Sequence, residues 1–152
     1  MMNRTCMSIQ QLIATLKADL PQKDITLYPP ASAQLMQQLE AALGVVLPAD
    51  FREFYAFCNG FGSAEFLFHI TPIEEILHFK DYQPHQFLFA EYGACVDFWI
   101  VEIAPEATSY RILSQGSAGE MVFLTDSLAL FIHRFLQGDI FGLLDWAAEL
   151  AN

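Results

Sequence analysis

Apolar residues in the first part of the chain recur at the spacing of amphipathic helices in three segments: residues 9–20, 33–43 and 48–58. Ser8 and Gln11 have the form of a capping box before the first segment, and Ser32 can cap the second. Pro21 ends the first helix, because the residue before a proline disfavours helical geometry. Residues 22–30 contain a Pro-Pro pair and are expected to form a linker.

The middle of the chain changes to an alternation of apolar positions, which indicates strands at residues 66–70, 87–92, 97–103, 110–113 and 121–124. Residues 73–79 are expected to form a short helix between the first two of these strands. The gaps hold turn residues such as Gly93 and Pro105. Short successive strands with short connections are typical of an antiparallel meander.

A continuous apolar stripe near the C-terminus predicts a strong helix from Leu128 to Leu136 that ends at Gly138. A final segment places Leu143 and Trp146 at helical spacing. The predicted fold is therefore α+β, one domain with an antiparallel sheet of about five to six strands packed with flanking helices. We divide it into an N-terminal helix and linker (residues 1–30), a central domain (31–138) and a C-terminal helical tail (139–152).

The segment from residue 39 to residue 62, LEAALGVVLPADFREFYAFCNGFG, has the most specific pattern. Gly44 can take the left-handed conformation that closes a helix, and Pro48 fits the first turn of the next one. Asp50 then lies in that first turn, where a negative charge is favoured. Asn59 and Gly60 are expected to stop this second helix.

This segment resembles the signature of the SMI1/KNR4 superfamily, also called SUKH domains. The motif residues are Glu40, Gly44, Leu47, Pro48, Asp50, Phe51, Phe54, Tyr55, Asn59 and Gly60. The resemblance implies helices packed against one antiparallel sheet and runs most clearly from residue 32 to residue 137. It departs from the family at residues 92–95, where members often carry a glycine-rich acidic turn.

The composition, with 54% hydrophobic and 14% aromatic residues, is that of a globular protein. No apolar run approaches the ~20 residues of a membrane helix, and the N-terminus does not read as a signal peptide. Three cysteines without a CxxC motif fit a reducing compartment, so we expect a cytoplasmic protein with Met1, Met2 or Met7 as its start. Cys58 is interpreted as a small buried hydrophobic residue.

The formal net charge of −11, from 18 acidic and 7 basic residues, argues against nucleic-acid binding. It allows steering toward a basic partner, and it equally fits plain solubility.

No catalytic constellation is evident in the sequence, and we expect no enzyme activity, no metal and no cofactor. The four histidines lack HxH or HExxH spacing. His78, Asp81 and His85 could converge on a metal, but surface polarity is the favoured interpretation.

Phe98 and Ile100 alternate with Trp99 and Val101, so this strand is apolar on both faces. Either the sheet is covered on both sides or one face is exposed and binds a partner.

The resemblance implies a non-catalytic binding module, because many bacterial proteins of this kind are immunity proteins that neutralise a toxin domain, often a nuclease or a deaminase. The alternative is a regulator or adaptor with an endogenous partner, as for eukaryotic members linked to cell-wall synthesis. We expect a monomer or weak dimer whose partner is a basic toxin domain. The candidate contacts are Glu65, Glu74, Glu75, Asp81, Glu91 and Asp97, with Tyr82, Tyr92 and Trp99 as aromatic anchors.

Overall fold

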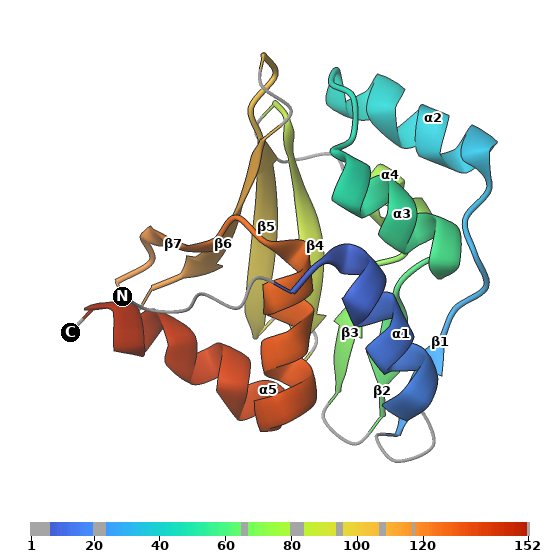
Figure 1. Cartoon of the computed structure of the whole chain (residues 1–152). Helices are drawn as coiled ribbons and strands as arrows, with labels where there is room; N and C mark the ends of the chain where they lie inside the picture. Colours follow the sequence, from blue (N-terminus) through green and yellow to red (C-terminus); the bar gives the residue numbers. More distant parts are fainter. Residues whose placement is uncertain are drawn as a thin grey trace.

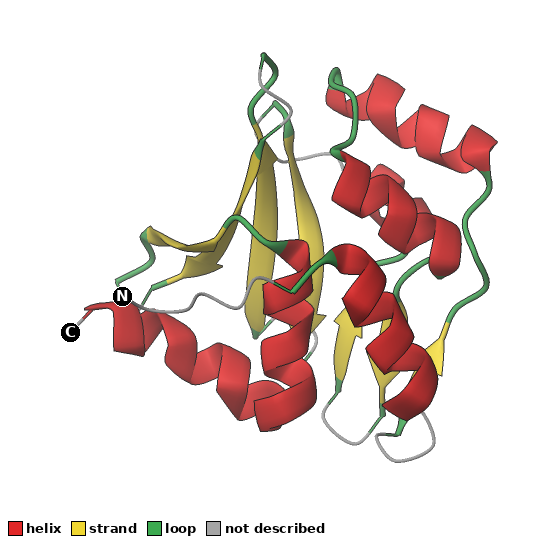
Figure 2. Ribbon diagram, viewed as in Figure 1, coloured by secondary structure: helices red, strands yellow, loops and turns green. Residues whose placement is uncertain are grey.

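Seven short strands form one antiparallel sheet, in which each strand pairs with the next along the chain. The structure is a computed structural model that describes residues 7–19, 24–64, 67–79, 84–93, 96–106, 109–116 and 118–151. Its strands are β1 (Ile25–Leu27), β2 (Phe61–Ser63), β3 (Phe68–Ile70), β4 (Gln86–Tyr92), β5 (Asp97–Ile103), β6 (Tyr110–Gln115) and β7 (Met121–Thr125). The predicted α+β meander is confirmed (Figure 2).

The prediction of five to six strands is wrong because β1 and β2 were not recognised. β1 lies in the segment interpreted as a linker, and β2 follows directly on the Asn59-Gly60 pair. Each has only three residues, too few to display an alternation. They add two strands beyond β3 to the edge of the sheet.

Five helices accompany the sheet in the described part of the chain: α1 (Ile9–Asp19), α2 (Ala33–Leu43), α3 (Ala49–Phe57), α4 (Ile73–His78) and α5 (Leu128–Ala151). In Figure 1, α1 and α5 lie in front of the sheet, and α2, α3 and α4 gather beside its β3–β4 half.

The predicted helix caps at the start of α1 and at both ends of α2 are confirmed. Ser8 Oγ accepts from the Gln11 backbone N–H, and Gln11 Oε1 accepts from the Ser8 N–H. Ser32 Oγ accepts from the Leu35 N–H. Gly44 closes α2 in the left-handed conformation, with φ of 72°.

The link between α2 and α3 is held by a side chain of the motif. Glu40 Oε2 accepts a hydrogen bond of 2.8 Å from the Leu47 backbone N–H. Pro48 lies at the N-cap, one position before the first turn in which it was predicted. Asp50 lies in that turn, as predicted, and also accepts a hydrogen bond from the Tyr110 hydroxyl.

The Asn59-Gly60 pair does not act as the helix stop that was predicted. α3 ends at Phe57, and the following residue is extended. Asn59 instead caps a distant helix: its Oδ1 accepts from the Ile73 N–H at the start of α4, and its Nδ2 donates to Glu74. Gly60 lies so close to β3 that a Cβ atom there would be 2.2 Å from the Ile70 carbonyl oxygen.

One hydrophobic core lies between the helices and one face of the sheet, called here the inner face. It extends from Leu12 of α1 to Trp146 at the C-terminal end of α5, so both ends of the chain contribute to it. Phe51 and Phe54 are fully buried in it. Cys58 is also fully buried, and burial raises the pKa of its thiol to about 12.

α5 is interrupted by non-helical geometry at Asp139, one residue after the predicted end at Gly138. Arg134 spans the kink, since its guanidinium donates to the Gly142 carbonyl and lies 4.4 Å from the ring centroid of Trp146. Among the described residues, no helix is long and apolar enough to cross a membrane.

Candidate partner-binding surface

The face of the sheet opposite the core, called here the outer face, carries a continuous apolar row across four strands. Leu88 pairs with Ile100, Ile100 with Leu113, and Leu113 with Phe123. None of the four belongs to the core cluster. Leu88, Ile100 and Leu113 are nearly buried, whereas Phe123 is 46% exposed. The sheet is therefore apolar on both faces, and only the inner face is explained by the core.

Other side chains border this apolar row. Phe98 is half-buried, and Met121 is exposed beside Phe123. The Arg111 guanidinium lies over the Phe123 ring, 6.0 Å from its centroid, and forms an ion pair with Glu102. Hydrogen bonds from Arg111 and then Gln86 hold the pKa of Glu102 below its usual value, so this carboxylate stays ionised beside the row.

No described helix covers this row. The buried residues of α1, α3, α4 and α5 all belong to the core cluster of the inner face. In Figures 1 and 2, the helices lie in front of the sheet or beside it, and the far side of β5, β6 and β7 carries no helix.

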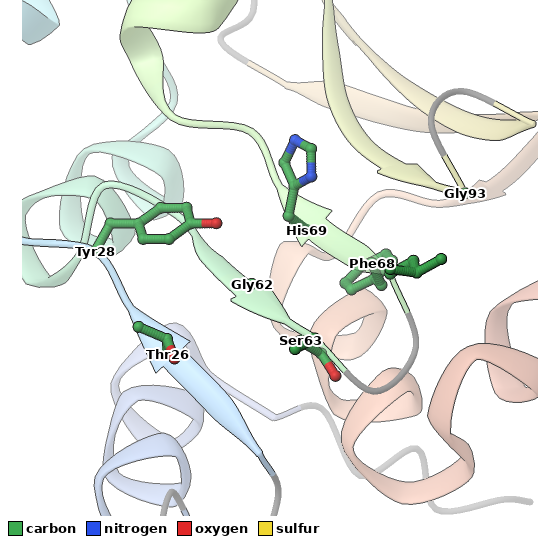
Figure 3. A pocket seen from close by; sticks show the side chains of 9 residues that line it. Thr26, Tyr28, Gly62, Ser63, Phe68, His69 and Gly93 are labelled. Atoms are coloured by element: carbon green, nitrogen blue, oxygen red, sulfur yellow. The ribbon is translucent and has the colours of Figure 1, made fainter.

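The other end of the outer face is hollowed over the three short strands β1, β2 and β3. Thr26, Gly62 and His69 are successive cross-strand partners on β1, β2 and β3. An open hollow of about 560 Å³ lies over them, with Tyr28 at one side (Figure 3). A Cβ atom at Gly62 would be 2.6 Å from the Tyr28 hydroxyl oxygen, so the ring lies directly against the glycine.

Two acidic side chains, one from β4 and one from α4, converge on His69 of β3. His69 and Glu91 are direct partners between β3 and β4, and His69 Nε2 lies 3.5 Å from Glu91 Oε2. Glu75 of α4 brings its Oε2 to 3.3 Å from the same nitrogen. Burial, and secondly the charge of Glu75, raise the pKa of Tyr28. A second open hollow, of about 550 Å³, lies beside this cluster. It is lined by His69, Glu75 and Glu91 together with Glu74, His78 and Phe79.

Glu91 reaches the outer face because of a β-bulge. The register between β4 and β5 shifts between Leu88 and Ala90, so Phe89 and Ala90 are both buried on the inner face. An unbroken alternation would have placed Glu91 on the same side as Phe87 and Phe89. The bulge turns its carboxylate toward His69 instead.

Of the predicted contact residues, the structure brings Glu74, Glu75 and Glu91 together at one end of the outer face. Tyr92 and Asp97 are paired where β4 and β5 meet their hairpin, on the same side of the sheet as the core residue Phe68. Glu65, Asp81 and Tyr82 lie outside the described residues.

The choice of Trp99 as an aromatic anchor at the surface is wrong. Its side chain is 1% exposed and packs in the core against Phe68 and Phe131. The sequence showed that β5 is apolar on both faces, but it did not show which face is covered by helices. The neighbouring Phe98 points to the outer face.

Sequence reasoning missed His69 and Phe123. His69 did alternate with two buried residues of its strand, which marks it as facing away from the core. The convergence of His78, Asp81 and His85, which the sequence analysis considered and did not favour, includes Asp81, a residue outside the described ranges. His78 lines the acidic hollow, and His85 Nδ1 lies 3.0 Å from the Leu43 carbonyl oxygen.

The fold and this surface define a class of protein: a single α+β domain whose antiparallel sheet has helices on one face and no described helix on the other. Residues 30–145 match the model of the SMI1 / KNR4 family (SUKH-1), and the chain belongs to this family. The resemblance inferred from the motif residues is thereby confirmed. No curated protein matches the chain.

Proposed function

We propose that the chain is a non-catalytic protein-binding module, a cytoplasmic immunity protein that binds a toxin domain and neutralises it by steric occlusion. The observation that carries this proposal is the apolar row on the outer face, at whose β7 end Phe123 and Met121 are exposed beside the nearly buried Leu113. Partly exposed aromatic and methionine side chains are typical of the centre of a protein interface.

The charges around the row favour a basic partner. Glu74, Glu75 and Glu91 lie together at one end of the outer face, and the whole chain carries a net charge of −11. Such a surface increases the rate of encounter with a positively charged domain, and toxin domains that act on nucleic acids carry this charge. The apolar row would then supply the buried contact area.

The first test is capture of the tagged protein from its native host under conditions that induce toxin expression, with identification by mass spectrometry. The expected result is one stoichiometric partner whose isolated domain arrests growth and is silenced when this protein is produced with it. Recovery of only an ordinary cellular protein would favour the regulator or adaptor alternative.

The binding face is tested by two matched phenylalanine replacements. Phe123 is 46% exposed on the outer face, and Phe141 is 63% exposed on α5. Phe123→Ser is expected to weaken the complex by at least ten-fold, about 1.4 kcal/mol, as for a central aromatic contact. Phe141→Ser is expected to bind like the parent, and the reverse pattern would place the interface on the helices.

A further inference from the structure

We propose that His69, Glu75 and Glu91 form a binding site for one divalent transition-metal ion of the Zn²⁺ type. The three residues each offer one ligand atom, and these atoms all lie within 4.8 Å of one another. The site lies on the outer face where β3, β4 and α4 meet. It is independent of the proposed function, because it is argued from the coordination geometry, burial and charge of these three residues.

The distances between the ligand atoms match a metal coordination shell. In a tetrahedral zinc site with bonds of about 2.0–2.1 Å, neighbouring ligand atoms lie roughly 3.3–3.5 Å apart. His69 Nε2 lies 3.3 Å from Glu75 Oε2 and 3.5 Å from Glu91 Oε2. The remaining separation, between the two carboxylates, is no more than 4.8 Å and can close through rotation of the glutamate side chains.

The His69 ring nitrogen lies against both carboxylates, which suits an ion pair when the ring is protonated and a metal ligand when it is neutral. Nε2 is buried from solvent and makes no hydrogen bond of normal geometry, although two carboxylates lie within 3.5 Å of it. A buried polar atom without a hydrogen bond is destabilising. Coordination to a metal uses the nitrogen lone pair and removes this cost.

The charges at the site also favour a cation. Two carboxylates that face one ring nitrogen carry like charges and repel each other. A divalent ion would neutralise both negative charges. The Glu91 side chain is 13% exposed and that of Glu75 is 47% exposed, so Glu91 is the less solvated of the two carboxylates.

Regular secondary structure holds all three ligands, and the space beside them is a hollow. His69 and Glu91 are cross-strand partners, and the bulge in β4 fixes the direction of Glu91. Glu75 lies in the first turn of α4, which Asn59 caps at Ile73. The hollow beside the site leaves room for a water molecule or a ligand from a partner at the fourth position.

The ligand set identifies the class of metal. One imidazole and two carboxylates suit Zn²⁺ and related first-row ions, whereas Mg²⁺ and Ca²⁺ prefer six or more oxygen ligands. Zn²⁺ should therefore bind and Mg²⁺ should not.

The experiment is calorimetric titration of chelator-treated protein without a histidine tag, using ZnCl₂ and, separately, MgCl₂. We expect one Zn²⁺ per chain, no measurable Mg²⁺ binding, and an unfolding midpoint that rises with Zn²⁺ concentration. His69→Gln and Glu91→Gln should each weaken Zn²⁺ binding by at least about 10- to 100-fold, since even outer-shell changes cost that much.

Two replacements serve as controls. Glu102→Gln removes a carboxylate from the neighbouring strand of the same face, and His85→Gln removes a histidine outside the cluster; both should bind Zn²⁺ like the parent. A ¹H–¹⁵N spectrum of the unmodified protein, in which Zn²⁺ shifts the His69 Nε2 signal, tests the site without any substitution. Absence of saturable binding below about 1 mM Zn²⁺ would overturn the proposal, as would loss of binding in His85→Gln alone.

Discussion

Several residues of the sequence motif act through hydrogen bonds to other elements or to the link between two helices. The Glu40 carboxylate accepts a hydrogen bond from the Leu47 N–H, and the Asn59 side chain caps α4. The Asp50 carboxylate accepts a hydrogen bond from the Tyr110 hydroxyl. The Tyr110 hydroxyl in turn accepts from the Leu128 N–H at the start of α5. The motif therefore joins helices to one another and to the sheet.

Gly60 permits a first test at the scale of single residues. Gly60→Ala should destabilise the protein by more than about 2 kcal/mol, because it combines a φ of 89° with a Cβ contact of 2.2 Å to the Ile70 carbonyl oxygen. Gly119 is the matched control, since its φ is 87° and no atom lies within 4 Å of an added Cβ. Gly119→Ala should cost only about 1 kcal/mol, measured by urea unfolding. Equal losses of stability in the two variants would mean that the positive φ explains both and that the close contact at Gly60 adds nothing.

Tyr110 permits a second test at this scale. Tyr110→Phe removes both a donor to Asp50 and the acceptor of the buried Leu128 N–H, so a loss of about 1–3 kcal/mol is expected. Tyr55→Phe removes a single bond to the Thr71 carbonyl and should cost less. Denaturation of the two variants in parallel compares them, and a larger loss for Tyr55→Phe would contradict the assigned role of Tyr110.

At the scale of elements, α5 is the clearest case of two segments joined by a side chain. Its two halves meet at Asp139, where the backbone is not helical. Arg134 in the first half donates two hydrogen bonds to the Gly142 carbonyl and contacts the Trp146 ring and Glu149 in the second half. The angle between the halves brings Ile140 and Leu143 into the core.

Arg134→Ala should destabilise the C-terminal half of α5 by about 2 kcal/mol, from the lost charged hydrogen bonds and the lost stacking. Arg134→Lys keeps the charge but cannot donate two bonds in a fork, so it should recover only part of the loss. Hydrogen exchange of residues 140–150 is the measurement. Unchanged protection in both variants would show that the buried apolar residues alone hold the kink.

At the scale of the whole molecule, the charge of −11 and the acidic end of the outer face should act together. Replacing Glu74 and Glu75 by lysine changes the net charge to −7 at one end of this face. Replacing Glu53 and Asp145 by lysine gives the same net charge of −7, but these two exposed acids lie on α3 and α5 and not on the outer face. Association with the basic partner proposed above should slow, and lose salt dependence, only in the first variant.

The measurement is the association rate at low and moderate salt, with a chelator present so that no metal contributes. Equal slowing in both variants would attribute the effect to net charge and not to the outer face. An unchanged rate in both would remove steering from the mechanism.

Much of this fold could be predicted from the chain itself. The caps of α1 and α2, the helix α4 and the strands β4 to β7 all follow from local spacing, because each depends on residues near in sequence. The strands β1 and β2 could not be predicted, since three-residue strands are stabilised by their neighbours in the sheet. Of the acidic end of the outer face, Glu74, Glu75 and Glu91 were predicted from the sequence as contacts for a basic partner, whereas His69 was not recognised and no metal was expected.

The sequence by itself determined the family, the order of the main elements and the presence of a sheet that is apolar on both faces. Only the tertiary structure decided which face the helices cover, and therefore that Trp99 is buried while Phe98 and Phe123 lie on the open side. It also decided that Glu91 meets His69, because a one-residue bulge reverses the side on which a strand residue lies. Local spacing shows that side chains alternate between the two faces of a strand, whereas pairing with other strands decides which face each side chain occupies.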